Sequence, residues 1–184
     1  MAKRILLLAS GSGSLAQAIF DADLGGDYRI VGLISDRASL ALERARNEGI
    51  KDIYLPMLPD RNEWNTRLFA LTQELHPDLV VSVGFMRILD RRYVETFKVM
   101  NTHPALLPAF PGAHAVRDAL AAGAMESGST VHWVDAGVDT GPIIAQQVVA
   151  IEDGDSEDSL HERIKIAERT LIVETLKLWI NGEL

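Results

Sequence analysis

The stretch Ile5-Leu6-Leu7-Leu8-Ala9-Ser10-Gly11-Ser12-Gly13-Ser14 decides the fold. Its first five residues form an uninterrupted apolar run, which is typical of a strand buried on both faces. Small residues then break the run, and apolar residues recur at helical spacing from Leu15 to Ala22. A strand, a glycine loop and a helix in this order form an arrangement that binds phosphate, because loop N–H groups and the helix amino terminus both face the anion. An ordinary tight turn accounts for the same residues equally well.

The glycine loop also fits a dinucleotide-binding pattern. Gly11, Gly13 and Ala16 match G-x-G-x-x-G/A. Asp36 follows a second predicted strand, Ile30–Ser35, where a ribose-binding acid would stand. A nicotinamide-dependent enzyme is therefore a second hypothesis. The pattern is short, however, and the sequence shows neither a second nucleotide-binding half nor a separate substrate domain.

Strand and helix patterns alternate along the chain as far as about residue 125. Further strands are predicted at residues 52–55, 78–83, 99–103, 129–134 and 143–150, and helices at 40–47, 60–75, 116–122 and from Ser156 onward. Asp60 and Ser156 are the expected caps of their helices. The buried stripe of the last helix is predicted to consist of Leu160, Ile164, Ala167, Leu171 and Leu178. This alternation predicts an α/β fold with a doubly wound, mostly parallel, Rossmann-like sheet. Because a single turn joins the last two strands, we expect them to form an antiparallel edge pair near the carboxyl terminus.

Composition narrows the classes of function. The 184 residues are 47% hydrophobic, which predicts one globular domain spanning residues 1–184 with a sizeable core. The net charge of −8 argues against a nucleic-acid partner. The absence of cysteine excludes disulfides and cysteine-bound metal, and it fits a cytoplasmic location. The apolar start of the chain ends at Ala9, too early for a membrane span, so no membrane partner is expected. The sequence leaves a homodimer open.

The segment Asn101-Thr102-His103-Pro104 carries the first candidate catalytic groups. Because side chains alternate along a strand, Asn101 and His103 share one face. Pro104 ends the strand, so both groups lie at its carboxyl end, where open α/β sheets bind ligands. A buried core histidine next to a turn asparagine is the alternative interpretation.

Together with Asp139, these residues suffice for transfer of an acyl group between two nitrogens. The amide of Asn101 can stabilise an oxyanion, and His103 can donate or accept a proton near neutral pH. Asp139 can hold the imidazole in its charged form and assist removal of a proton from an amine. Neither a serine nor a cysteine nucleophile is needed, since the substrate amine attacks. Taken alone, Asp139 also fits a solvated turn residue.

Five stretches, in matching order and spacing, resemble the glycinamide ribonucleotide formyltransferase family of purine biosynthesis. They are Gly11–Ser14, Gly84-Phe85-Met86-Arg87-Ile88-Leu89, Asn101–Pro108, Phe110–His114 and Asp135–Pro142. The resemblance covers nearly the whole chain. It implies transfer of a formyl group from 10-formyltetrahydrofolate, as co-substrate, to glycinamide ribonucleotide, with no metal. It also implies that Asn101, His103 and Asp139 are the catalytic residues.

The resemblance assigns further site residues. It implies that the substrate phosphate and ribose meet Gly11, Ser12, Gly13, Ser14, Leu15, Pro104 and Glu168, with Glu168 holding the ribose hydroxyls. It implies that the folate meets Met86, Arg87, Ile88, Leu89, Val94, Asp135, Ala136, Gly137 and Val138, and that Arg61 meets its glutamate tail. A cis peptide bond between Leu107 and Pro108 is a further expectation.

Two related enzymes differ from this sequence in domain content, and Leu15 differs from the family's usual phosphate loop. Formyltetrahydrofolate hydrolase, the closest competing function, carries an amino-terminal regulatory domain, for which the strand beginning at residue 4 leaves no room. Methionyl-tRNA formyltransferase adds a carboxyl-terminal domain and a basic surface, which this sequence lacks. The departure is Leu15, where the family's phosphate loop often has asparagine, so the loop must bind through its backbone. A binding module without catalysis is the remaining alternative, and the intact trio argues against it.

Overall fold

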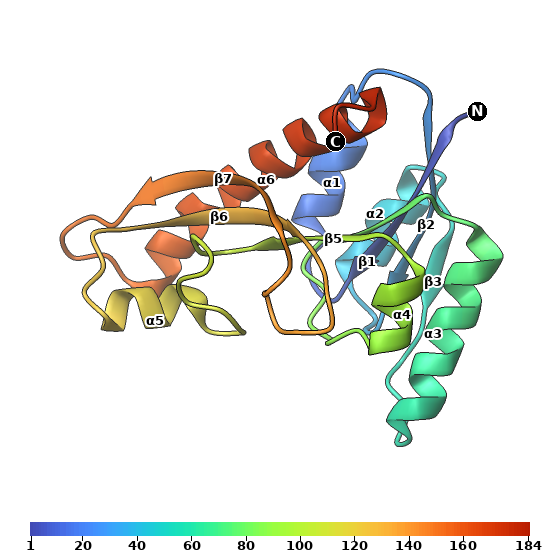
Figure 1. Cartoon of the computed structure of the whole chain (residues 1–184), viewed down its shortest axis with the longest axis horizontal. Coiled ribbons are helices and arrows are strands. Elements are labelled where there is room, and N and C mark those ends of the chain that lie inside the picture. The colour runs from blue at the N-terminus through green and yellow to red at the C-terminus, as the bar shows by residue number, and fades with distance from the viewer.

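Seven strands form a single sheet in the order β3-β2-β1-β4-β5-β6-β7 (Figure 1). The computed structural model describes all residues from Met1 to Leu184. The strands are β1 (Lys3–Ala9), β2 (Tyr28–Ser35), β3 (Asp52–Tyr54), β4 (Leu79–Ser82), β5 (Val99–His103), β6 (Glu126–Trp133) and β7 (Ile143–Ala150). β1 to β5 are mutually parallel, whereas β6 pairs antiparallel with both β5 and β7. The predicted mostly parallel sheet and antiparallel β6–β7 pair are therefore confirmed, and the antiparallel portion extends one strand further, to β5.

Helices cover both faces of the sheet. They are α1 (Ser14–Asp21), α2 (Leu40–Asn47), α3 (Arg61–Leu75), α4 (Arg91–Thr96), α5 (Ala115–Ala121) and α6 (Glu157–Asn181). Side chains of β1 alternate between two buried clusters: Ile5, Leu7 and Ala9 pack with α1, α2 and α6, while Leu6 and Leu8 pack with α3 and α4. Burial on both faces explains the continuous apolar run of this strand.

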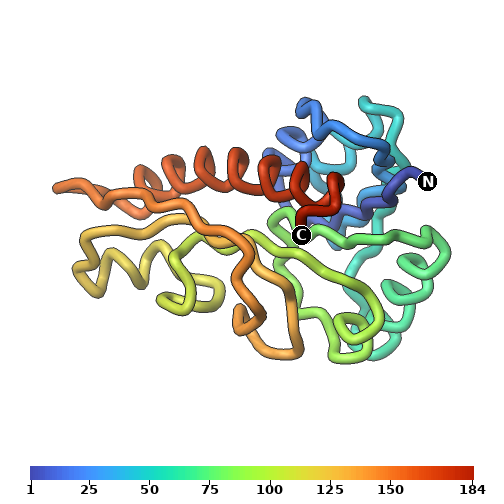
Figure 2. The backbone as a smooth tube through the Cα atoms, turned by 45° about the horizontal axis from the view of Figure 1, so that its top comes forward, coloured from blue at the N-terminus to red at the C-terminus, as the bar shows by residue number.

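The longest helix, α6, runs beside β6 and β7 and ends next to α1 (Figure 2). Its start is fixed by a capping box, in which the side chain of Ser156 accepts from the N–H of Ser159 and the Ser159 hydroxyl accepts from the N–H of Ser156. This confirms Ser156 as the cap. The prediction that Leu178 belongs to the buried stripe of α6 is wrong, because Leu178 is 41% exposed and Trp179 is buried instead.

Element bounds agree with the sequence patterns to within a few residues, and one helix was not predicted. Asp60 caps α3 by accepting from two backbone N–H groups, as its position indicates. The short α4 begins behind a similar cap, Asp90. The peptide bond between Leu107 and Pro108 is cis, as expected. No helix in the structure combines the length and the apolar character needed to cross a bilayer.

Candidate active site

A cavity of about 510 Å³ opens at the carboxyl ends of β1, β4 and β5. It is bordered by the glycine loop, by the loop after β4, by the β6–β7 loop and by one face of α6. From the predicted site it collects Gly11, Ser12, Gly13, Ser14, Leu15, Met86, Arg87, Ile88, Leu89, Asn101, His103, Pro104, Asp135, Gly137, Val138, Asp139 and Glu168. Residues that are far apart in sequence thus meet at the edge where parallel sheets bind ligands.

The glycine loop is held in shape by helix α2. Gly13 precedes α1 and has φ +72°. It lies so close to α2 that an added Cβ would stand 2.7 Å from the Cα of Ala41. The guanidinium of Arg44 donates to the Ser12 carbonyl at 2.9 Å. The first N–H groups of α1 have no partner within the helix, and they lie beside the cavity. The loop therefore offers backbone donors to an anion without needing a side-chain amide at Leu15.

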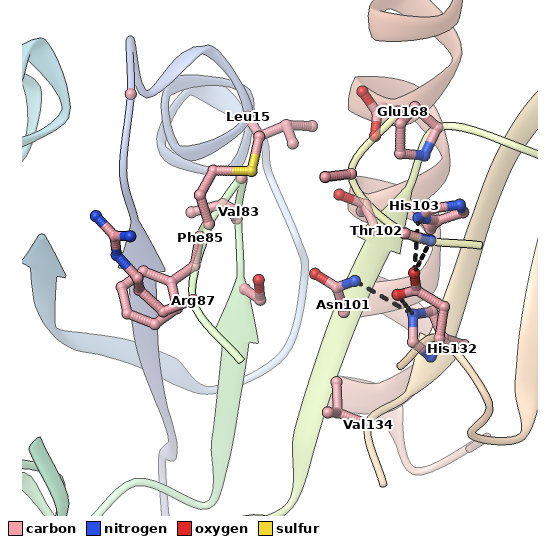
Figure 3. A pocket seen from close by; sticks show the side chains of 18 of the residues that line it. Leu15, Val83, Phe85, Arg87, Asn101, Thr102, His103, His132, Val134 and Glu168 are labelled. Atoms are coloured by element: carbon pink, nitrogen blue, oxygen red, sulfur yellow. Dashed lines mark hydrogen bonds and ion pairs between the residues drawn. The ribbon is translucent and has the colours of Figure 1, made fainter. Parts of the chain in front are cut away.

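Asn101 is oriented by a histidine from the neighbouring antiparallel strand. His132 lies opposite Asn101 in the β5–β6 register, and its Nε2 is 3.2 Å from the Asn101 amide nitrogen (Figure 3). The other ring nitrogen, Nδ1, donates to the Trp133 carbonyl at 2.9 Å. In the neutral ring this leaves Nε2 free to accept one N–H of Asn101. The second N–H of the same amide is then available to a bound substrate.

His103 is buried, and both of its ring nitrogens face acceptors. Nε2 lies 2.8 Å from the Phe110 carbonyl, which can only accept, so Nε2 carries a hydrogen. Nδ1 lies 3.4 Å from Asp139 Oδ2. The doubly protonated ring is therefore the form in which both nitrogens face suitable partners. This arrangement suits a group that donates a proton from Nδ1 and whose charged form the neighbouring carboxylate stabilises.

Asp139 connects the two histidines. Its Oδ1 lies 3.6 Å from His132 Nε2, and its Oδ2 accepts from the Gly112 N–H at 2.8 Å. When Nε2 of His132 carries a hydrogen, its contact with Asp139 is the largest cause that lowers the pKa of this carboxyl below its usual range. The Gly112 N–H and the charge of His103 act in the same direction, although partial burial opposes the change. Asp139 itself has φ +54°, a left-handed conformation that Asp tolerates better than most residues. The carboxylate is therefore ionised at neutral pH.

Helix α6 presents three ionisable groups to the cavity, one turn or so apart: His161, Lys165 and Glu168. Glu168 is only 6% exposed. Burial raises its pKa to about 7, although a hydrogen bond with Thr102 acts in the opposite direction. Burial and the nearby Lys165 lower the pKa of His161. Glu168 can accept hydrogen bonds from hydroxyl groups of a ligand. Lys165 adds positive charge to the cavity, which the glycine loop also lines.

The opposite wall of the cavity is apolar and firmly held. Met86, Ile88 and Val138 line it, and they are 64%, 67% and 49% exposed in the free protein. The Met86 N–H donates to the Ser10 hydroxyl at 2.8 Å. One guanidinium nitrogen of Arg61 donates to the Ile88 carbonyl at 2.5 Å. A preformed apolar wall of this kind suits a flat aromatic ligand.

Three residues of the predicted folate site lie outside the lining of this cavity. Arg61 stacks over the Trp64 ring at 4.6 Å and supports the wall from behind. Val94 packs into the core between the sheet and α3. Ala136 belongs to the β6–β7 loop but not to the cavity lining. Arg87 lines the cavity, yet its guanidinium turns aside to Asp36, with Nε 2.6 Å from Oδ2.

Several lining residues were missed from the sequence, among them Thr102, His132, His161 and Lys165. His161 and Lys165 precede Glu168 at helical spacing, so the face of the last helix carried a usable signal. His132 could be found only through the β5–β6 register, which no local pattern fixes. The structure contains no group of three or more His, Asp or Glu side chains arranged to hold a metal ion.

Comparison with known proteins agrees with this geometry. Residues 3–176 match the family model described as formyl transferase. Over 176 residues, covering 92% of this chain and 81% of the relative, the sequence is 51% identical to a phosphoribosylglycinamide formyltransferase of Mycobacterium tuberculosis. It is 41% identical to part of a trifunctional purine biosynthetic protein, adenosine-3, of Drosophila pseudoobscura pseudoobscura, covering 99% of this chain and 14% of that protein.

A solved structure extends the likeness to three dimensions. Glycinamide ribonucleotide transformylase 1 from Symbiobacterium toebii superimposes with a TM-score of 0.94 at 39% identity, covering 98% of this chain and 89% of that one. The match includes the strands and loops that border the cavity. The chain therefore belongs to the formyl transferase family.

Proposed function

We propose that this protein transfers the formyl group of 10-formyltetrahydrofolate directly to the amino group of glycinamide ribonucleotide, a step of purine biosynthesis. The observation that carries the proposal is the meeting, in one cavity, of a glycine loop, an apolar wall and the cluster of Asn101, His103, Asp139 and His132. The glycine loop suits the phosphate of the ribonucleotide, the apolar wall suits the pterin of the folate, and the cluster suits the reacting amino and formyl groups. The names of the relatives support the same reaction.

The two substrates fit the cavity from opposite ends. The phosphate is bound by the loop from Gly11 to Leu15, whose backbone donors and helix terminus favour an anion. Lys165 adds a cation on the facing helix, and Glu168 accepts the ribose hydroxyls. Pro104, directly after His103, also lines the cavity. The amino group of the substrate then points toward His103.

The folate lies on the apolar side. Its pterin packs against Met86, Ile88, Leu89 and Val138, and the loop from Asp135 to Val138 closes over it. Arg61 supports this wall from outside through the Ile88 carbonyl, and Arg87, which lines the cavity, is held by Asp36. Arg61 therefore acts on the folate site through the shape of the loop, and its guanidinium is already occupied in the free protein. The formyl carbon is placed between the wall and Asn101.

The chemistry follows from three groups. The substrate nitrogen attacks the formyl carbon, and the Asn101 N–H that does not bind His132 stabilises the oxyanion of the tetrahedral intermediate. Asp139, kept ionised by its neighbours, takes the proton of the attacking amine directly or through water. His103 donates a proton from Nδ1 to the leaving nitrogen of the folate, and the proton that Asp139 took from the amine then passes to Nδ1, which restores both groups. The formyl group thus moves from one nitrogen to the other with no covalent enzyme intermediate.

A single assay tests the proposal. The protein is mixed with 10-formyltetrahydrofolate with and without glycinamide ribonucleotide, and loss of the formyl group is followed by absorbance. Rapid loss that requires the ribonucleotide supports transfer. Equal loss without it would identify a hydrolase, and no loss in either case would leave a binding protein.

The nicotinamide alternative is tested by calorimetry. It requires Asp36 to face a ribose, but this side chain is fully buried and pairs with Arg87. We therefore expect glycinamide ribonucleotide to bind and NAD or NADP to show no binding. Tight binding of either nicotinamide nucleotide would contradict the assignment of the glycine loop to phosphate.

A further inference from the structure

Thr130, in the middle of β6, is fully buried, and its hydroxyl makes three hydrogen bonds. The hydroxyl donates to the Ala105 carbonyl at 2.6 Å and accepts from the Leu107 N–H at 3.0 Å. It also accepts from the side-chain amide of Gln146 at 2.9 Å. A hydroxyl has one donor and two acceptor sites, so this one is saturated. Two of its three bonds reach the loop that follows His103.

Gln146 reaches the same loop from the next strand. It lies opposite Thr130 in the β6–β7 register, and its amide nitrogen donates to the Leu107 carbonyl at 2.9 Å as well as to the Thr130 hydroxyl. Side chains of two adjacent strands thus bind three backbone groups within residues 105–107. Buried backbone N–H and C=O groups need hydrogen-bond partners. In this loop two side chains supply them, where a strand would use backbone groups of its neighbour.

The far end of this loop contacts both ionisable members of the catalytic trio. Its Phe110 carbonyl accepts from His103 Nε2 at 2.8 Å, and its Gly112 N–H donates to Asp139 Oδ2 at 2.8 Å. The loop therefore has an anchored beginning and an end that touches His103 and Asp139. If residues 105–107 shifted, the Phe110 carbonyl would move with them. This carbonyl determines which nitrogen of the neutral His103 ring carries the hydrogen.

Two neighbouring hydroxyls show that β6 does not need such bonds for packing. Ser127 and Ser129 lie on the same strand, are 1% and 0% exposed, and their hydroxyl oxygens have no hydrogen-bond partner. Burial in this strand therefore does not by itself give a hydroxyl a partner within the protein. The full set of bonds at Thr130 is specific to the loop.

We propose that Thr130 and Gln146 are positioning residues, which anchor residues 105–107 so that the Phe110 carbonyl holds Nε2–H of His103 and leaves Nδ1 to Asp139. This inference rests on the proposed function for its kinetic consequence. Its structural consequence, the state of the His103 ring, does not depend on the reaction. Neither side chain needs to touch a substrate for this role.

The test uses Thr130→Val, which keeps the shape and removes every bond, and Gln146→Leu. Matched controls are Ser129→Ala on the same strand and Gln147→Leu beside Gln146. We expect kcat to fall about 10- to 100-fold in both test variants, in the range caused by misplaced catalytic groups, with the KM of both substrates within about twofold of wild type. Thr130→Ser should restore most of kcat, because it restores the hydroxyl.

Nitrogen-15 NMR of the His103 ring provides the second measurement. In wild type and in both controls, Nε2 should be protonated at every pH at which the ring is neutral. In Thr130→Val and Gln146→Leu, the neutral ring should become a mixture of both tautomers, and the pH profile of kcat should shift with it.

The inference is overturned if both test variants keep the wild-type ring spectrum. Lower stability with unchanged kcat and spectrum would show a merely structural role and would also overturn it. If Thr130→Val does not fold, kcat and the ring spectrum of Gln146→Leu test the inference, because Gln146 lies on an exposed edge strand. If wild type itself transfers no formyl group, the proposed function fails, and the ring spectra still decide whether the anchor exists.

Discussion

The buried carboxyl of Glu168 makes stability depend on pH in a direction that can be worked out from the structure. Its side chain lies among α6, β5 and the cavity, and burial raises its pKa from 4.5 to about 7. Between these two values the folded protein keeps a proton that the unfolded chain has lost. Because the folded state then binds more protons, the free energy of unfolding falls as pH rises through this window. The contribution is fully present below pH 4.5 and lost above pH 7.

The size of the effect follows from the same change in pKa. At about 1.4 kcal/mol per pKa unit, ionising this buried group costs the fold about 3 kcal/mol. Glu168→Gln removes the titration while keeping the shape of the side chain. From pH 5 to pH 8, we expect wild type to lose about 2 kcal/mol more stability than Glu168→Gln does.

Urea unfolding of wild type, Glu168→Gln and Glu174→Gln at several pH values measures this difference. Glu174 lies on the same helix and is exposed, so its variant should follow wild type at each pH. Parallel curves for wild type and Glu168→Gln would refute the reasoning, because they would show that Glu168 ionises in the folded protein without cost.

Three further predictions concern the catalytic cluster and the glycine loop. Asn101→Ala should lower kcat about 10²–10³-fold in the formyl transfer assay, as loss of one oxyanion donor does, with unchanged affinity for both substrates by calorimetry; a collapse of affinity with kcat preserved would exclude the oxyanion role. Gly13→Ala should destabilise the fold by about 1–3 kcal/mol in urea unfolding and weaken ribonucleotide binding, because its Cβ would lie 2.7 Å from the Ala41 Cα at φ +72°; wild-type stability and binding would contradict this. The double variant His103→Ala with Asp139→Asn should lose much less activity than the product of the two single losses; fully multiplicative losses would show that the two residues act independently.

The fold was readable from the sequence because its signals are local. Ile5–Ala9 is apolar throughout, as burial between two helical layers requires, and Asp60 and Ser156 mark helix starts by the capping chemistry that the structure shows. The short α4 was not predicted because its six residues are too few to show a helical repeat of apolar side chains. Leu178 was misplaced since the last turns of α6 bury Trp179 and Ile180 on a rotated stripe.

The candidate site was readable only in part, because some of its contacts depend on tertiary register. Strand alternation and the proline placed Asn101 and His103 together, and the needs of acyl transfer suggested Asp139, which the family resemblance also implied. His132 joins them only through antiparallel pairing of β6 with β5, which the sequence did not predict. The direction of the Arg61 guanidinium was also beyond the sequence, since it depends on contacts with the Trp64 ring and the Ile88 carbonyl.

The central claim, direct formyl transfer assisted by Asp139, is tested most directly by following the formyl carbon itself. 10-Formyltetrahydrofolate labelled with carbon-13 in its formyl group is supplied with glycinamide ribonucleotide, and the products are identified by NMR. The account predicts that wild type places all label on the ribonucleotide nitrogen, and that Asp139→Asn does so at least about 10²-fold more slowly with its fold intact. Label released as free formate, or transfer by Asp139→Asn at the wild-type rate, would contradict it.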